Sequence, residues 1–199
     1  MTVDFDLPFP VHISNEPLNV DVKGIKCTLY LEMVPRENID PRLRRGGGDF
    51  DLIEDRFGWV RYSKVSVSIP LNQLPPAPVG MKQDEWPIEI AVSAVNNFLA
   101  HYRDLLNLPW IRRMNPTEVW AADVTYNERK LPERTVHYRR THQIRPRIVG
   151  ISDELEQTLR GRLSGTQRAS PWKLLLLDAE DALSRGDTRL AVILGQTAI

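Results

Sequence analysis

The sequence predicts an α+β protein, in which an antiparallel, β-rich N-terminal part with a long packed helix and a β-hairpin is followed by the start of an α-helical bundle. Two observations carry this prediction. Apolar and polar residues alternate over 25–33 and again over 59–69, which is the period of a strand with one buried face. After the proline-rich stretch 70–80, the apolar period becomes helical over 84–106 and again near the end of the sequence.

The two early strands are expected to form an antiparallel pair joined by a surface loop. Pro35 ends the first strand, and the loop over 35–50 carries a glycine triplet, Gly46–Gly48, beside several arginines. Glycine backbone next to arginine can cradle phosphate, but this segment lacks the Gly-Lys-Ser/Thr of a P-loop, so we favour a flexible hairpin loop. Prolines interrupt residues 1–23, which favours edge strands or extended arms there.

The middle of the chain is expected to supply one long helix and a second strand pair. Residues 84–106 have apolar side chains at helical spacing. Acidic residues stand at the N-terminal end of this segment, where they interact favourably with the helix dipole. Two further strands, over 119–126 and 135–144, are expected to be joined across the polar turn 127–132. Ser152 can then cap a short helix.

Residues 170–199 are expected to form a helical hairpin. Ser170 followed by Pro171 is a typical helix start, because serine caps the first turn and proline fits the first helical position. Gly186 can adopt the left-handed conformation that ends a helix, and Asp187 can cap the next one.

The second terminal helix carries an apolar run over 190–194 that covers most of its circumference, so we expect it to be a buried core element. This apolar pattern has no stop signal by Ile199, which predicts partner helices downstream in a longer protein. We therefore expect two units, an α+β domain over 1–165 and the first two helices of an incomplete helical domain over 170–199.

The charges are balanced overall but unevenly distributed along the chain. The formal net charge is zero, yet residues 1–40 hold three Lys or Arg against seven Asp or Glu, and residues 134–173 hold nine against three. A single cysteine, Cys27, excludes an internal disulfide framework and fits a reducing compartment. The N-terminus lacks the basic and apolar regions of a signal peptide, and no apolar run is long enough to span a membrane, so we expect a cytoplasmic protein without membrane contact.

The basic segment at 134–147 is the strongest candidate site in the sequence. Arginines interleaved with tyrosine and histidine suit phosphate contacts combined with base stacking. We therefore predict nucleic-acid contact, and the residues assigned to it are Arg139, Arg140, His142, Arg145 and Arg147. The alternative is a solvated edge strand whose charge is balanced by the acidic N-terminal region.

Other chemistry finds little support in the sequence. The four histidines are scattered and there is one cysteine, so no zinc-ligand spacing exists, and we predict no metal site and no cofactor. Asp123 with Glu128-x-Lys130 weakly matches the acidic-and-lysine pattern of one nuclease superfamily, but Glu128 falls in the expected turn. Cys27 lies inside a predicted strand rather than in a nucleophile motif.

The two terminal helices contain the segments Leu174-Leu-Leu-Leu-Asp178-Ala179, Ala182-Leu183, Gly186-Asp187-x-Arg189-Leu190-Ala191-Val192 and Thr197-Ala198. These segments resemble the opening helices of HEPN domains, which are helical bundles of bacterial toxin, abortive-infection and CRISPR-associated proteins. Residues 95–103 and 110–113 are also similar to N-terminal regions of bacterial proteins with such a C-terminus. The resemblance implies a dimerising bundle, often an RNase that uses an arginine and a histidine a few residues apart. That Arg-x4-6-His motif is absent from the 199 residues, so the catalytic residues of such a protein would lie beyond Ile199 or be missing.

Our leading hypothesis is an N-terminal recognition or regulatory region of a HEPN-like bacterial protein in phage defence, which contacts RNA or DNA through the basic hairpin. The alternative is a protein-interaction or oligomerisation module without nucleic-acid binding or catalysis. A weaker third hypothesis is a stand-alone enzyme whose site is scattered over loops. The expected partners are RNA or DNA, and a second copy or a partner protein bound through the terminal helices.

Overall fold

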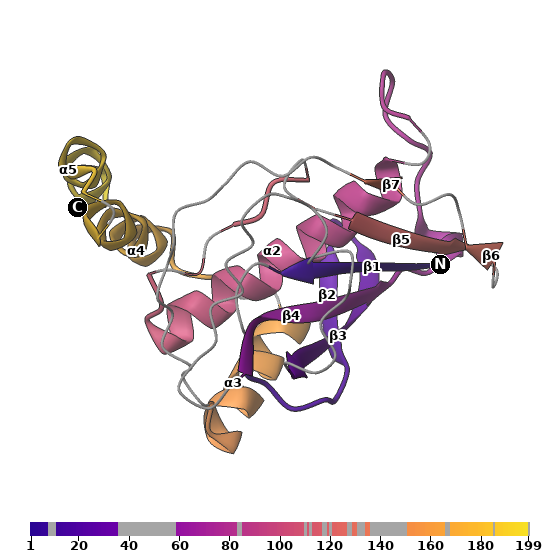
Figure 1. The fold of residues 1–199 in the computed structure, drawn as a ribbon, viewed down its shortest axis with the longest axis horizontal. Coiled ribbons are helices and arrows are strands. Elements are labelled where there is room, and N and C mark those ends of the chain that lie inside the picture. Colours follow the sequence, from indigo (N-terminus) through magenta and orange to yellow (C-terminus); the bar gives the residue numbers. More distant parts are fainter. Residues whose placement is uncertain are drawn as a thin grey trace.

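The computed structural model has an α+β fold, so the predicted fold class is confirmed (Figure 1). An antiparallel sheet carries two helices on one face, and a helical hairpin stands at one side of this body. The structure describes residues 1–7, 11–35, 59–82, 85–109, 111, 113–116, 119, 121–126, 129–130, 134–135, 151–165, 168–184 and 186–198.

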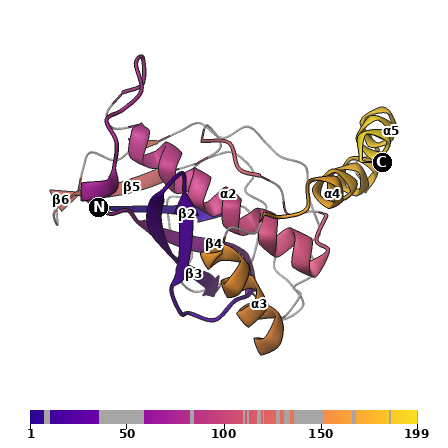
Figure 2. The same cartoon turned by 180° about the vertical axis from the view of Figure 1, so that it is seen from behind.

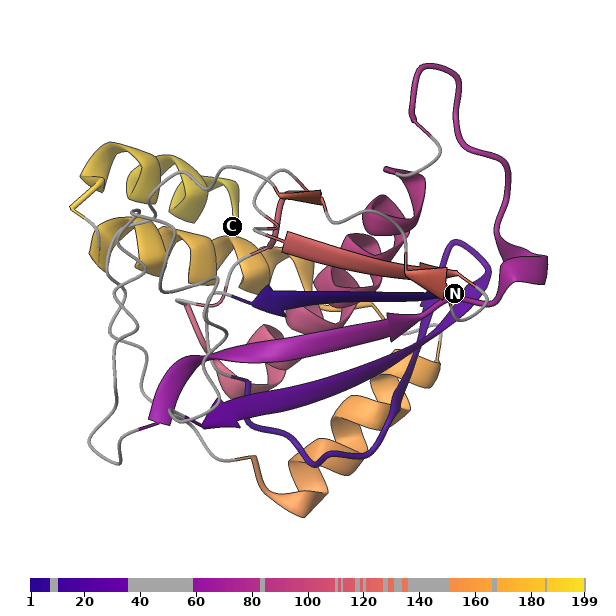
Figure 3. The same cartoon turned by 45° about the vertical axis from the view of Figure 1, so that its right-hand side comes forward.

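Strand pairing in the sheet is antiparallel throughout its described part, and the spatial order is β2-β3-β4-β1-β5-β6, with β7 also paired to β5 (Figure 3). The strands are β1 (Thr2–Leu7), β2 (Leu18–Val22), β3 (Ile25–Pro35), β4 (Trp59–Ser68), β5 (Ala121–Tyr126), β6 (Arg129–Lys130) and β7 (Arg134–Thr135).

The predicted antiparallel pair of early strands is confirmed as β3 and β4. Leu29 lies opposite Val67 and Leu31 lies opposite Val65, and all four side chains are buried on the helix-covered face. The alternation of apolar and polar residues therefore identified both the strands and their buried face, because a strand turns successive side chains to opposite faces.

The expectation of edge strands in residues 1–23 holds for β2 but is wrong for β1. β1 lies inside the sheet between β4 and β5, and its alternate residues Val3, Phe5 and Leu7 are buried. The prolines that suggested an edge follow Leu7 or stand before Leu18, so they remove no hydrogen bond from β1.

Of the second predicted strand pair, the structure describes most of the first strand and the beginning of the second. β5 coincides with most of the predicted 119–126 strand, and Arg134 and Thr135 of β7 pair with Ala122 and Ala121. The two-residue strand β6, inside the predicted turn, also pairs with the end of β5. Residues 136–144 of the predicted second strand lie outside the described residues.

Two helices cover the sheet. The predicted long helix is confirmed as α2 (Trp86–Leu106), and α3 (Asp153–Ser164) packs against both α2 and β2 (Figure 2). Ser152 caps α3 as predicted, since its hydroxyl accepts a hydrogen bond from the Leu155 N–H at 3.4 Å. The main apolar core forms between these helices and the sheet, and it includes Phe98 and Tyr102 of α2, whose rings stack with a centroid separation of 5.4 Å.

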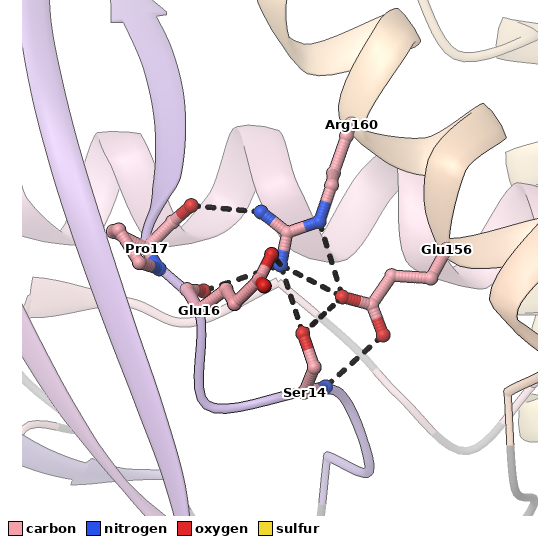
Figure 4. Close-up of polar contacts among 5 residues, drawn as sticks. All are labelled: Ser14, Glu16, Pro17, Glu156 and Arg160. Carbon is pink, nitrogen blue, oxygen red and sulfur yellow. Dashed lines mark hydrogen bonds and ion pairs between the residues drawn. The ribbon is translucent and has the colours of Figure 1, made fainter.

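A polar cluster fastens α3 to the segment between β1 and β2 (Figure 4). Glu156 accepts hydrogen bonds from the Ser14 N–H at 3.0 Å and from the Ser14 hydroxyl. Arg160, one turn later, lies 2.7 Å from Glu156 and donates to the Ser14 hydroxyl and to the carbonyls of Glu16 and Pro17. Because each partner of the buried carboxylate is a hydrogen-bond donor, the cluster offsets the cost of its burial.

The remaining helices form the predicted terminal hairpin, α4 (Pro171–Ser184) and α5 (Thr188–Thr197), which pack against each other. Gly186 has φ +81°, the left-handed conformation expected at the stop, and Asp187 caps α5 by accepting from the Leu190 N–H at 3.0 Å. Among the described helices, none combines the length and the apolar character needed to cross a bilayer.

Candidate interaction site on the terminal helical hairpin

The five residues predicted to contact nucleic acid lie outside the described part of the chain: Arg139, Arg140, His142, Arg145 and Arg147. The structure describes where the segment that holds them begins. Arg134 and Thr135 pair with β5, on the side of that strand away from β1. Nucleic-acid contact through this segment stays a prediction.

Two of the other chemical candidates, Asp123 and Cys27, lie in the described part of the chain. Asp123 lies opposite Asp4 of β1 in the strand register, whereas Glu128 falls outside the described residues. Cys27 is buried in β3, and burial followed by the negative charge of Asp21 raises the pKa of its thiol to about 11, so it is a poor nucleophile. Within the described ranges, no three His, Cys, Asp or Glu residues are grouped closely enough to hold a metal ion.

The terminal hairpin instead exposes apolar side chains along α4. Trp172, Leu176 and Leu183 are 55%, 39% and 59% exposed. With the half-buried Ala179, they follow a spacing of four, three and four residues, which places them on one face of the helix. We call these four residues the α4 stripe.

α5 adds further exposed apolar side chains, namely Leu190, Val192 and Ile193. Leu190 and Ile193 are three residues apart and therefore lie on the same side of α5. No described residue of α5 is buried, so the described part of the chain does not supply the core that the sequence predicts around this helix, and the predicted downstream helices stay a prediction. α5 packs against α4, which cannot cover a helix that is apolar around most of its circumference.

The hairpin is also separate from the main core. That core contains side chains from the sheet, from α2, from α3 and from the segment after α2, but none from the described residues of α4 and α5. Leu177 and Ala182 of α4 are buried outside it. The hairpin therefore does not share the apolar core that stabilises the α+β body.

Charged residues at the C-terminal end of α2 meet α4. Arg103 is buried, and its Nη1 donates to Asp178 of α4 at 2.7 Å. The adjacent Asp104 accepts from Arg162 of α3 at 2.8 Å, and its other carboxylate oxygen lies 3.3 Å from the amine of Lys173 in α4. We call Arg103, Asp104, Lys173 and Asp178 the α2–α4 junction.

His101 lies one turn before Asp104 on α2 and is buried. Its Nδ1 atom has no hydrogen-bond partner among the described residues. Burial, followed by the positive charge of Arg162, lowers the pKa of His101, while Asp104 acts in the opposite direction. These effects favour the neutral form of the imidazole beside this junction.

Sequence reasoning found the apolar faces of both terminal helices but not their exposure, because periodicity does not reveal whether a partner covers a face. It also gave no sign of the α2–α4 junction, whose partners are far apart in the sequence. No protein-family model matches the chain, and no curated protein or solved structure is significantly similar to it. The resemblance to HEPN domains thus stays a prediction from the residues named above.

Proposed function

We propose that this chain is an association and recognition region in which the α4–α5 hairpin binds the same hairpin of a second copy. The observation that carries the proposal is the exposed α4 stripe together with Leu190 and Ile193 of α5. Large exposed apolar patches are rare on monomers and mark surfaces that another molecule covers.

A second copy suits this surface in two ways. Two hairpins placed face to face supply the four helices of a bundle, in which apolar faces meet at the centre. The α4 stripe carries no charge, so packing it against its own symmetry mate buries no unpaired ion. The resemblance to HEPN domains, which implies a dimerising bundle, supports the same partner.

Sedimentation equilibrium of the chain at micromolar concentration tests this proposal. We expect a dimer for the wild type and a monomer for Leu183→Glu, because dimerisation would bury a charge in an apolar interface. The matched control is Val79→Glu, which adds the same charge at an exposed apolar position outside the hairpin and should stay dimeric. A monomeric wild type, or a Leu183→Glu variant that dimerises equally well, would contradict the proposal.

The second proposed function is contact with RNA or DNA through the basic segment that follows β7. One support is the excess of basic residues over 134–173. The other is the pairing of Arg134 and Thr135 with β5, because it anchors the beginning of the basic segment to the sheet. We infer that Arg139, Arg140, Arg145 and Arg147 contact phosphates, with His142 stacking on a base.

Fluorescence anisotropy with labelled single-stranded RNA and duplex DNA, at about 50 and 200 mM salt, tests the second function. We expect binding that weakens with salt and is lost when Arg139, Arg140, Arg145 and Arg147 are changed to Ala. A control with the exposed Arg113, Arg168 and Arg189 changed to Ala should still bind. Absence of binding at the lower salt would refute nucleic-acid contact and leave the association surface untouched.

Together these proposals describe an N-terminal recognition or regulatory region of a HEPN-like bacterial protein in phage defence. We infer a cytoplasmic setting from the single cysteine, whose burial in β3 needs no oxidising compartment. We assign no catalytic step to the described residues.

A further inference from the structure

We propose that the α2–α4 junction is an ionic latch that sets the direction in which the terminal hairpin leaves the α+β body. It is a conformational device, and it does not depend on the proposed self-association. Three observations support it: the polarity of the two ion pairs, the fixed position of Arg103, and the absence of described α4 and α5 residues from the main core.

The two ion pairs have opposite polarity. On α2, Arg103 is positive and the adjacent Asp104 is negative, whereas on α4 the order along the chain is Lys173 and then Asp178. Arg103 binds Asp178 at 2.7 Å, and Asp104 lies 3.3 Å from Lys173. Sliding α4 along α2 or reversing its direction would bring like charges together, so the pattern selects one placement of the helix.

Arg103 is held in place by the segment that follows α2. Its Nε donates to the carbonyl of Leu108 at 3.3 Å and its Nη2 to the carbonyl of Pro109 at 3.2 Å. Its side chain is only 4% exposed, whereas that of Asp178 is 44% exposed. The guanidinium is thus a fixed receptor on the body, and Asp178 is the partner that can leave into water.

Asp104 is fixed in a similar way. Its side chain is 9% exposed and also accepts from Arg162 of α3 at 2.8 Å, while Lys173 forms an ion pair with its carboxylate and donates a hydrogen bond to its backbone carbonyl. α3 therefore holds the body's side of the latch in place. The hairpin contributes two side chains near the surface, Lys173 and Asp178. Water and salt can weaken the attraction between these two side chains and the α+β body.

The hairpin adds no described side chain to the main core. Loss of these ion pairs would therefore let the hairpin change its orientation relative to the α+β body without unfolding that body. The latch therefore gives the chain two states, one with the hairpin seated against α2 and one with the hairpin released from α2. A change in hairpin direction moves the exposed α4 stripe relative to the sheet.

Single-molecule fluorescence transfer between dyes at Ser93→Cys on α2 and Gln196→Cys on α5 tests the latch. Both positions are exposed, and the native Cys27 is buried and weakly reactive, so the dyes attach where intended. At picomolar concentration the copies are separate, and the result is therefore independent of self-association.

The decisive variant is Lys173→Asp with Asp178→Lys, which reverses both pairs and keeps the net charge. We expect one narrow transfer efficiency for the wild type, and a shifted and broadened distribution for this variant. The matched control swaps two exposed charges of the hairpin outside the latch, Glu180→Arg with Arg189→Glu, and should behave as the wild type. The same mean and width in the reversed variant as in the wild type would overturn the latch.

Circular dichroism checks that each variant remains helical. If the reversed variant fails to fold, the neutral pair Lys173→Met with Asp178→Asn decides the question by the same readout. It removes both attractions without creating repulsion, so broadening relative to the wild type supports the latch, and a wild-type distribution refutes it.

Discussion

Glu156 of α3 accepts hydrogen bonds from both the N–H and the hydroxyl of Ser14, a residue 142 positions earlier in the chain. Arg160 completes this contact through its 2.7 Å ion pair with Glu156 and its 2.8 Å hydrogen bond to the Pro17 carbonyl. The cluster shown in Figure 4 therefore joins the segment before β2 to a helix formed far later in the sequence.

Changing Glu156 to Gln should lower the free energy of unfolding by about 1–3 kcal/mol, the range for charged hydrogen bonds that lose a partner. The amide keeps one acceptor but places an N–H₂ group among the donors of Ser14 and Arg160. Urea unfolding measures the change. Glu154→Gln is the matched control, because Glu154 also lies in the first turn of α3 but is exposed. Equal losses for both variants would mean that the helix dipole, not the cluster, explains the effect.

Lowering the pH should decrease the free energy of unfolding over a pH range that depends on the pKa of His101. Burial and the charge of Arg162 lower the pKa of His101 below its ordinary 6.5, so the folded chain binds fewer protons than the unfolded chain below that pH. The stabilisation is complete above pH 6.5 and declines as the pH falls, by at most about 1.4 kcal/mol per pH unit. Urea unfolding at a series of pH values should show this slope.

The variant His101→Gln should lose that slope, whereas the exposed His12→Gln should keep it.

A second decrease in the free energy of unfolding, at lower pH, is expected from Glu156. Burial raises the pKa of that carboxyl, but hydrogen bonds from Ser14 and Arg160 together bring it below 4.5, so its contribution is lost only as the pH falls below that value. If the stability of His101→Gln still declines with pH between 6.5 and 4.5, another group is responsible for the decline.

Cys27 should resist thiol reagents in the folded protein. Its pKa of about 11 leaves little thiolate at pH 8, and β3 buries the sulfur. Reaction with a chromogenic disulfide should therefore be slow in native buffer and fast in urea, whereas an introduced Gln196→Cys should react at once. Rapid modification of the wild-type chain before unfolding would contradict the buried position.

Phe98→Ala should be among the most damaging single changes. Phe98 is fully buried in α2 and stacks on Tyr102 at 5.4 Å, so the shorter side chain leaves a cavity where α2 meets the sheet. We expect a loss of about 3–5 kcal/mol in urea unfolding. Ser93→Ala on the exposed face of the same helix is the control and should change stability by less than about 0.5 kcal/mol. A small loss for Phe98→Ala would indicate that the core rearranges around the gap.

The sequence predicted best those elements whose cause is local. The alternation in β3 and β4, the helical period of α2, and the caps at Ser152 and Asp187 depend on residues within a few positions of one another. Gly186 belongs with them, since its left-handed φ is a property of a single residue.

The features that sequence reasoning missed depend on distant partners. Nothing near residues 2–7 shows that β4 and β5 pair with both edges of β1. The ion pair between Arg103 and Asp178 spans 75 residues, and each residue alone reads as an ordinary surface charge. The apolar pattern of α5 is the same whether or not a neighbour covers the helix, so its exposure became visible only in the structure.

The interior position of β1 bears on how the protein is made. β1 is synthesised before the other described strands, and it pairs with β4 on one side and with β5, which ends only at Tyr126, on the other. Its two neighbours are thus synthesised long after it, and loop closures of this length slow folding. Until β5 emerges, one edge of β1 lacks this strand partner, and an unpaired strand edge favours aggregation of a nascent chain.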